Sequence, residues 1–262
     1  MELSKPLKEA KKRMSDKVWD SVCREEILKT GMSTTKDPDF DNKGYKVVRN
    51  ICPLELLENE VPEVPGGTGM LNYHGGVDDY VYDEVEHQVK GSLARYWYPF
   101  YRKTHDFVRK QIEKEIKSPL FKTYYYDRFY YPGQDLEYHI DRDSCEISIT
   151  IHCGSNLRDD WPICVKGVDG SVAEVNLKPG DGLIYKGCER PHWRLPMPGV
   201  KRNIIRKLFG LDAYYYHQIF FHYVLKYGKR AQFAGDNSSA GDANYYNEGF
   251  RAKIVTFESE TS

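Results

Sequence analysis

The run CEISITIHC, from Cys145 to Cys153, lies at the centre of a long β-rich part of the chain. Similar short runs flank it on both sides: FKTYYYDRFYY (121–131), WPICVKGV (161–168), VAEVNLK (172–178), DGLIYKG (181–187) and HQIFFHYV (217–224). Turn signals separate these runs, namely PGQD, GSN, VDGS, KPGD and PMPG. Several short strands at this spacing predict a β-sandwich or a β-barrel.

The residues before this region are expected to support it with a helix. Within residues 78–117, apolar side chains recur mostly every three or four positions, which predicts a long helix with one apolar stripe. Residues 45–57 contain a strand-like Val-Val pair and then a turn into a short helix. We therefore expect one domain over residues 46–226, with the helical support at 78–117 and a β core at 121–226.

The two ends of the chain are expected to lie outside that domain. Residues 1–45 are polar and charged, and they predict a loosely packed arm with some helix between Lys5 and Leu28. Residues 227–262 are low in aliphatic side chains and rich in Gly, Asn and Ser, which predicts a polar C-terminal extension.

Composition excludes several classes of protein. The net charge of −1 over 262 residues gives no electrostatic case for a nucleic-acid partner. No apolar run approaches the ~18 residues of a membrane span, and the N-terminus is charged where a signal peptide is apolar. The six cysteines are scattered without a CxxC pair, which favours free thiols in a reducing cytoplasm. We therefore expect a cytoplasmic protein without a membrane partner.

The candidate chemistry begins at His139 and Asp141, which form the only H-x-D among the histidines. If this segment is a strand, both side chains point to the same face. An imidazole nitrogen and a carboxylate oxygen would then be adjacent ligands of one metal. A histidine from a distant strand would complete a two-histidine, one-carboxylate triad with three open positions. The competing interpretation is a chance pair on a surface turn.

The surrounding motifs favour the metal site. Y-P-G (131–133) precedes the H-x-D, the CEISITIHC run follows it, and K-P-G-D-G-L-I-Y (178–185) leads to P-H-W-R (191–194). This order, over about two fifths of the chain, resembles the double-stranded β-helix oxygenases that use Fe(II) and 2-oxoglutarate, and most closely their prolyl-hydroxylase-like branch.

The resemblance implies a mainly β (α+β) fold with a double-stranded β-helix, or jelly-roll, core and N-terminal helices packed on it. It also implies His139, Asp141 and His192 as iron ligands and Tyr131 as a wall of the cosubstrate pocket. Fe(II), 2-oxoglutarate and O₂ would be the cofactor and cosubstrates.

The residue that anchors 2-oxoglutarate does not follow the family pattern. Lys201 and Arg202 have the spacing after the third ligand at which family members carry a basic residue, but a loop or short helix is expected there. Arg194 lies two residues after His192, so on one strand it would face the same side and could hold a carboxylate with two parallel hydrogen bonds. We favour Arg194; its competing interpretation is a surface ion pair. The inserted stretch from Gly199 to Tyr216 is a candidate lid.

The expected activity is hydroxylation of an unactivated C–H bond with release of succinate and CO₂. The carboxylate of Asp141 argues against halogenation, because halogenating relatives carry a small residue there. The substrate, a small molecule or a peptide, and the oligomeric state stay open. Two alternatives remain: a cupin-like metal-binding enzyme that does not use 2-oxoglutarate, and a non-catalytic jelly-roll interaction protein.

Overall fold

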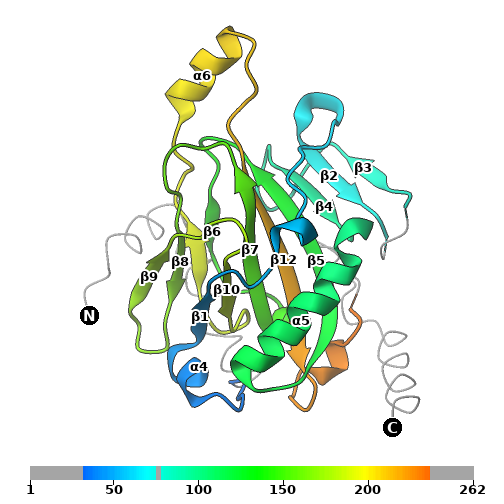
Figure 1. Ribbon diagram of the computed structural model, residues 1–262, viewed down its shortest axis with the longest axis vertical. Coiled ribbons are helices and arrows are strands. Elements are labelled where there is room, and N and C mark those ends of the chain that lie inside the picture. Colours follow the sequence, from blue (N-terminus) through cyan, green and yellow to red (C-terminus); the bar gives the residue numbers. More distant parts are fainter. Residues whose placement is uncertain (1–31, 75–77, 237–262) are drawn as a thin grey trace.

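The computed structural model describes residues 32–74 and 78–236 (Figure 1). The helix expected between Lys5 and Leu28 lies outside these described residues. Within them, no helix has the length and apolar character needed to cross a membrane. Five of the six cysteines are described; all five are buried and free, as expected.

The strands of the described residues form two β-sheets, which make the body of the molecule (Figure 1). The large sheet has the strand order β1-β10-β7-β12-β5-β4-β2-β3 and the small sheet the order β6-β11-β8-β9. Neighbouring strands are antiparallel except for β2 and β4. The large-sheet strands are β1 (Tyr45–Val48), β2 (Gly69–Asn72), β3 (Val81–Asp83), β4 (Leu93–Tyr96), β5 (Leu120–Tyr130), β7 (Ile147–Ser155), β10 (Gly182–Tyr185) and β12 (Tyr216–Leu225). The small-sheet strands are β6 (Leu136–His139), β8 (Ile163–Lys166), β9 (Val172–Val175) and β11 (His192–Arg194).

Helices are few and short in the part of the chain that the structure describes. There, the α-helices are α4 (Pro38–Lys43), α5 (Arg102–Ile116) and α6 (Val200–Leu208). The 3-10 turns are η2 (Leu54–Leu56), η3 (Pro65–Gly67), η4 (Pro99–Tyr101), η5 (Asp143–Cys145) and η6 (Ala231–Phe233). The fold is therefore mainly β, and the predicted jelly-roll core is confirmed.

The large sheet has two different faces because side chains alternate along each strand. On β7, Ile147, Ile149 and Ile151 belong to an aliphatic cluster that also contains apolar residues of α5. We call this side the outer face. The intervening residues, including Thr150 and His152, point to the opposite side, which we call the inner face. The inner face meets the small sheet, and the jelly roll encloses its site between the two.

The predicted helix over residues 78–117 is wrong in its first half. Only Arg102–Ile116 is α-helical, and the preceding residues form β3, β4 and η4. The side chains of Leu93 and Tyr96 have helical spacing, but β4 pairs with β5 on one edge and β2 on the other, and all its residues are buried. Tertiary pairing therefore decided the structure where local periodicity was ambiguous.

The described parts of the predicted arm and extension, residues 32–45 and 227–236, pack against the domain. The backbone N–H of Ser33 donates to the carboxylate of Glu189, and its hydroxyl donates to Glu146 at 2.5 Å. Arg230, also buried, donates from Nε to Asp143 at 2.9 Å. Buried charged groups are stable only when paired, so these contacts fix residues 32–44 and 227–236 to the domain.

Candidate metal centre

The small sheet brings the two predicted histidine ligands together. His139 is the last residue of β6, His192 is the first residue of β11, and the two are direct partners in the antiparallel register. Their ring centroids are 4.3 Å apart. Cross-strand neighbours are the closest side-chain pairs that a sheet offers, so the distant sequence positions meet at one point.

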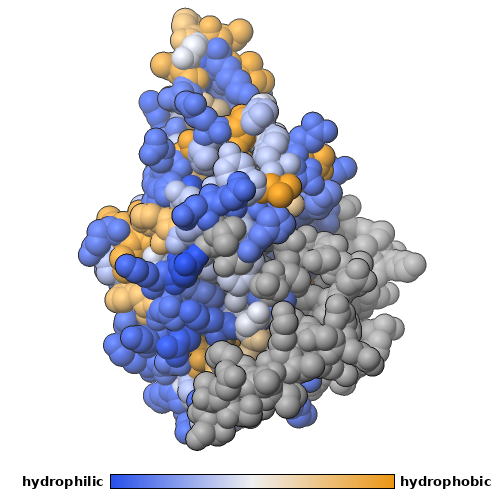
Figure 2. Space-filling view, turned by 90° about the vertical axis from the view of Figure 1, so that its right-hand side faces the viewer, coloured by the Kyte–Doolittle hydropathy of each residue, from blue (hydrophilic) through white to orange (hydrophobic). Residues whose placement is uncertain are grey.

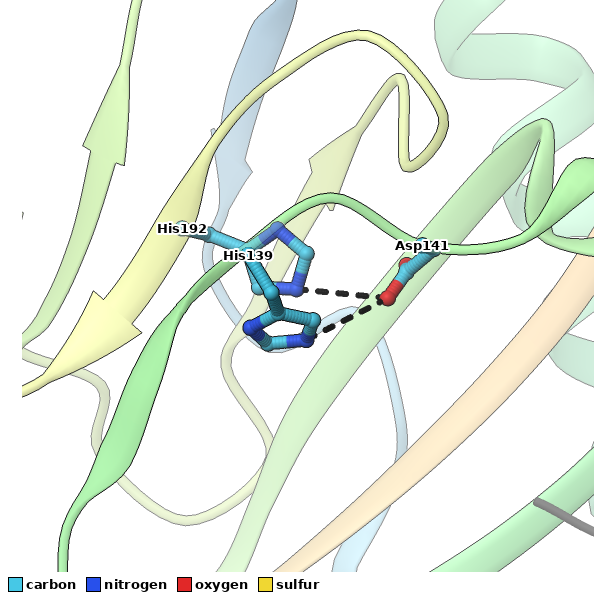
Figure 3. Close-up of side chains that lie close together, drawn as sticks. All are labelled: His139, Asp141 and His192. Atoms are coloured by element: carbon cyan, nitrogen blue, oxygen red, sulfur yellow. Dashed lines mark ion pairs between the residues drawn. The ribbon is translucent and has the colours of Figure 1, made fainter. Parts of the chain in front are cut away.

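Asp141 reaches the same point from a loop, because β6 ends two residues before it. Its backbone N–H donates to the carbonyl of Gly187 at 2.9 Å, which holds the loop beside β11. Asp141 Oδ1 lies 3.5 Å from Nε2 of His139 and 3.5 Å from Nε2 of His192 (Figure 3). An ion that bonds nitrogen and oxygen at about 2.1 Å, as zinc does, fits among atoms at this separation.

Each imidazole is oriented by a hydrogen bond from its other nitrogen. Nδ1 of His139 lies 2.7 Å from the carbonyl of Glu137, and Nδ1 of His192 lies 3.0 Å from that of Arg190. A carbonyl only accepts, so Nδ1 carries a proton and Nε2 is the nitrogen that faces Asp141. Metal-binding histidines are usually held in this way.

Asp141 is held as a carboxylate. Burial acts to raise its pKa, but the neighbouring His192 and His139 outweigh burial and hold the pKa of Asp141 well below its usual range. Its second oxygen, Oδ2, accepts a hydrogen bond from the hydroxyl of Ser148 at 3.0 Å, and that hydroxyl also contacts Nδ1 of His222 at 2.9 Å. Oδ1 is thereby left to face the two histidines.

A second group of three potential ligands, Asp141, Cys145 and His222, shares the carboxylate with the first. Burial raises the pKa of Cys145 to about 12, so its sulfur stays a protonated thiol. A thiol is a poor ligand compared with a thiolate. The group of His139, Asp141 and His192 is therefore the better metal site, and its two nitrogens and one oxygen match the facial triad of non-haem Fe(II) enzymes.

Arg194 lies at the other end of β11 with its guanidinium buried on the inner side. It donates to the carbonyl of Trp161, to Oε1 of Gln218 at 2.7 Å and to the hydroxyl of Tyr216 at 3.4 Å. The rings of Trp161 and Tyr216 lie 4.5 and 4.7 Å from its guanidinium carbon. No carboxylate in the described part of the chain forms an ion pair with it. The competing interpretation, a surface ion pair, is therefore wrong.

Several polar atoms near Arg194 have no hydrogen-bond partner within residues 32–74 and 78–236. They are Nε of Arg194, Nε2 of Gln218, Oγ1 of Thr150 and Nε2 of His152. Buried donors and acceptors without partners are costly, at roughly 1–3 kcal/mol each. A group of them beside an unpaired cation is typical of a site that receives a polar anion.

The other two candidate anchors lie elsewhere. Lys201 and Arg202 are exposed on α6, and Arg202 forms an ion pair with Asp159 at the surface. α6 buries none of its side chains and stands away from the body of the molecule (Figure 1), so the stretch that contains it is not a lid in this structure. Spacing along the chain had suggested these residues, but the helix carries them outward.

Tyr131 also differs from its predicted place. Its hydroxyl donates to the carbonyl of Gly67 at 3.1 Å, and its side chain lines a surface pocket of about 650 Å³ whose walls include none of the three candidate ligands. The preceding residue, Tyr130, points inward instead and packs against Trp161 with ring centroids 5.0 Å apart. Successive side chains of an extended segment point to opposite sides, which explains why Tyr130 points inward and Tyr131 points to the surface.

No sequence motif predicted Ser148 or Gln218 as part of the site. Ser148 and Gln218 lie on long strands where no motif distinguishes them from core residues. Their inward direction becomes visible only from the pairing of β7 with β12, in which Gln218 lies opposite His152 and His222 opposite Ser148.

No protein-family model matches the sequence, and a comparison with curated proteins finds no relative. Solved structures with a related chain path include a Pseudomonas putida prolyl-4-hydroxylase, with 14% identity, 71% of this chain and 95% of that chain covered, and a TM-score of 0.43. A Trichoplax adhaerens prolyl hydroxylase in complex with a hypoxia inducible factor peptide fragment is 12% identical. That match covers 74% of this chain and 89% of that chain, with a TM-score of 0.47. The non-heme alpha ketoglutarate dependent epimerase from nogalamycin biosynthesis is 10% identical. That match covers 80% of this chain and 90% of that chain, with a TM-score of 0.49. At these values the matches carry no argument about activity.

Proposed function

We propose that this chain is an Fe(II)- and 2-oxoglutarate-dependent dioxygenase that hydroxylates an unactivated C–H bond of a small-molecule or peptide substrate. The observation that carries the proposal is the pairing, on the short strand β11, of one metal-ligand candidate, His192, with a buried and unpaired cation, Arg194.

The metal would be held by His139, Asp141 and His192. Bound Fe(II), with 2-oxoglutarate and O₂, supplies the oxidising power for C–H hydroxylation and yields succinate and CO₂. Asp141 occupies a ligand position with its own carboxylate, which leaves no vacant place for a halide.

Arg194 would receive the distal carboxylate of 2-oxoglutarate. An arginine offers two parallel N–H donors to a carboxylate, and such charge-assisted hydrogen bonds are about twice as strong as neutral ones. The amide nitrogen of Gln218, whose oxygen accepts from Arg194, and the hydroxyl of Thr150 are unpartnered polar groups on the facing strands β12 and β7. The aromatic rings of Trp161 and Tyr216 exclude water from the cation and so strengthen its attraction for the anion.

The cupin-like alternative needs the triad but has no use for Arg194. The unpaired cation therefore favours the 2-oxoglutarate enzyme over a metal enzyme without this cosubstrate. A non-catalytic interaction protein would need neither the three converging ligands nor the cation.

The test is an anaerobic titration of Fe(II) and 2-oxoglutarate, followed by the weak visible charge-transfer band of the chelate. Wild-type protein should develop the band at saturating 2-oxoglutarate, and His139→Ala should not. A wild-type protein that binds Fe(II) but develops no band and shows no 2-oxoglutarate binding by calorimetry would point to the cupin-like alternative.

A further inference from the structure

The helix α6 presents an apolar surface at one end of the molecule. It stands away from the two sheets (Figure 1), and none of its side chains is buried. Figure 2 shows apolar side chains gathered at this same upper end. The exposed large apolar residues of α6 and the turn after it, with their exposed fractions, are Val200 (47%), Ile204 (57%), Ile205 (53%), Leu208 (79%), Phe209 (78%) and Leu211 (53%).

The back of α6 is fastened to the body. Arg202 forms an ion pair with Asp159, and Nε of Arg206 donates to the carbonyl of Asp212 at 2.7 Å. Oδ1 of Asn203 accepts the backbone N–H of Tyr214 at 2.8 Å. These contacts fix the rotation of the helix about its axis, so its opposite side faces outward.

The outward side is a narrow apolar stripe. Residues four apart lie on one side of a helix, which aligns Val200, Ile204 and Leu208. Val200, at the base of the helix, lies beside Gly133, so Ile204 and Leu208 form the outward part of the row. Phe209 and Leu211 extend the stripe past the end of the helix. Exposed apolar side chains scattered singly are ordinary, but a contiguous group marks an interaction site.

Two lysines flank the stripe. At 100° per residue, Lys201 falls on one side of the Val200–Ile204–Leu208 row and Lys207 on the other. Both are exposed, and neither forms an ion pair within the described ranges. The segment from Gly199 to Leu211 contains four basic residues and no acidic residue, although the whole chain has a net charge of −1. The nearest acidic residue along the chain, Asp212, follows Leu211 directly, and its backbone carbonyl accepts a hydrogen bond from Arg206.

We propose that α6 with Phe209 and Leu211 is a docking surface for an anionic lipid membrane. The apolar stripe would enter the boundary between headgroups and acyl chains, while Lys201 and Lys207 contact anionic headgroups. A basic amphipathic helix with large apolar residues lies in a membrane interface in this manner, and lysines reach up to the headgroups with their charged ends. A helix of this length gives weak, reversible binding.

Charge complementarity selects this occupant over a second copy of the chain. Pairing two α6 helices about a two-fold axis would bring the lysines of one stripe against those of the other, and like charges repel. An anionic surface instead attracts Lys201 and Lys207, the two exposed lysines of the segment, which form no ion pair within the described ranges.

The experiment is co-sedimentation of the full-length protein with vesicles of phosphatidylcholine, with and without phosphatidylserine. We expect binding to the vesicles that contain phosphatidylserine, weakened by added salt because exposed charges are screened. The double variant Leu208→Ser/Phe209→Ser should lower the partition coefficient roughly tenfold or more, because two large apolar side chains no longer enter the interface. Lys201→Gln/Lys207→Gln should lower it severalfold.

The matched control is Tyr227→Ser, which removes an aromatic side chain that is 83% exposed outside this surface. It should bind vesicles like wild type. Thermal unfolding of all variants should coincide, since none of the changed side chains is buried. Equal binding by wild type and the double variant, or no binding to either vesicle, overturns the proposal. So does a dimer in size-exclusion chromatography that Leu208→Ser/Phe209→Ser dissolves, or a protein ligand that occupies the stripe without vesicle affinity.

Discussion

The outer and inner faces of the large sheet are built from the same strands but have opposite chemistry. On β7, Ile149 and its outward neighbours pack under α5 in an aliphatic cluster, while Ser148, Thr150 and His152 face the small sheet. The outer face also contains buried polar groups, but most of them are paired: Asp127, which lies opposite Ile219, accepts a hydrogen bond from Arg95 and lies 2.8 Å from Nε2 of His217. The inner face holds buried donors and acceptors without partners. Such groups destabilise a fold, so their concentration on one face indicates that stability is supplied on one side and ligand binding on the other.

The largest expected effect comes from removing a metal ligand on the inner side. His192→Ala should lower metal affinity by more than about 100-fold, since even the loss of a residue that only orients a ligand costs 10–100-fold. Metal binding by calorimetry is the measurement. The thermal unfolding of the metal-free variant should stay close to that of the metal-free wild type. Unchanged metal affinity would show that the three side chains converge for another reason.

Replacing Arg194 should affect 2-oxoglutarate binding and the free energy of unfolding in different ways. Arg194→Met should weaken 2-oxoglutarate binding about 100-fold, because two charge-assisted hydrogen bonds of roughly 1.5–3 kcal/mol each are lost. The same change should leave the free energy of unfolding equal or higher, because a buried unpaired cation becomes an apolar side chain. Arg202→Gln is the control and should bind 2-oxoglutarate like wild type. If Arg202→Gln weakens binding and Arg194→Met does not, the anchor has been assigned to the wrong residue.

A substitution on the outer face should lower the free energy of unfolding and leave ligand affinities unchanged. Ile149→Ala removes a fully buried side chain and should lower the free energy of unfolding by about 2–4 kcal/mol. Affinities for metal and 2-oxoglutarate, measured where the variant is still folded, should be unchanged. Chemical denaturation with parallel calorimetry makes the comparison, and a loss of affinity would mean that the two faces are coupled.

The buried His152 on the inner face should also make the free energy of unfolding depend on pH. Burial lowers the pKa of His152 from its ordinary value of 6.5 to about 4. Above pH 6.5 both folded and unfolded chains hold this histidine neutral, whereas between pH 6.5 and 4 only the unfolded chain takes up its proton. Stability should therefore fall as the pH falls through this window, by on the order of 2 kcal/mol from this residue. In urea denaturation at several pH values, His152→Gln should show a shallower fall than wild type; an identical slope would contradict the assignment.

The smallest effect is expected from the hydroxyl that orients Asp141. Ser148→Ala removes the hydrogen bond to Oδ2 and should lower metal affinity about tenfold, in the range found for residues that orient metal ligands. Metal competition with a chelator resolves such a change. An affinity equal to that of wild type would mean that the loop contact from Asp141 to Gly187 suffices to hold the carboxylate.

The triad was predictable because two of its residues, His139 and Asp141, are close in sequence and the third, His192, lies in a recognisable motif. His139 and Asp141 are two residues apart, and P-H-W-R marks His192 through its neighbours. The β core followed from turn signals between short strands. The structure brings these three side chains together as predicted, although Asp141 lies on a loop rather than on the strand.

The errors arose where the outcome depends on tertiary pairing. Leu93 and Tyr96 have helical spacing, yet β4 is held between two strands. Tyr131 follows the last residue of β5, and a shift of one residue turns a side chain to the other face. Arg202 has a plausible distance along the chain from His192, but α6 projects it to the surface. No single-sequence pattern records these long-range contacts.

The most direct test of the central claim is a single-turnover reaction. Wild-type protein loaded anaerobically with Fe(II) and 2-oxoglutarate is exposed to O₂, quenched, and analysed for succinate. The inner-face site predicts succinate in proportion to the iron bound, and none above background from His192→Ala. Bound iron with 2-oxoglutarate recovered unchanged after exposure to O₂ would contradict the assignment of this face to 2-oxoglutarate-dependent oxidation.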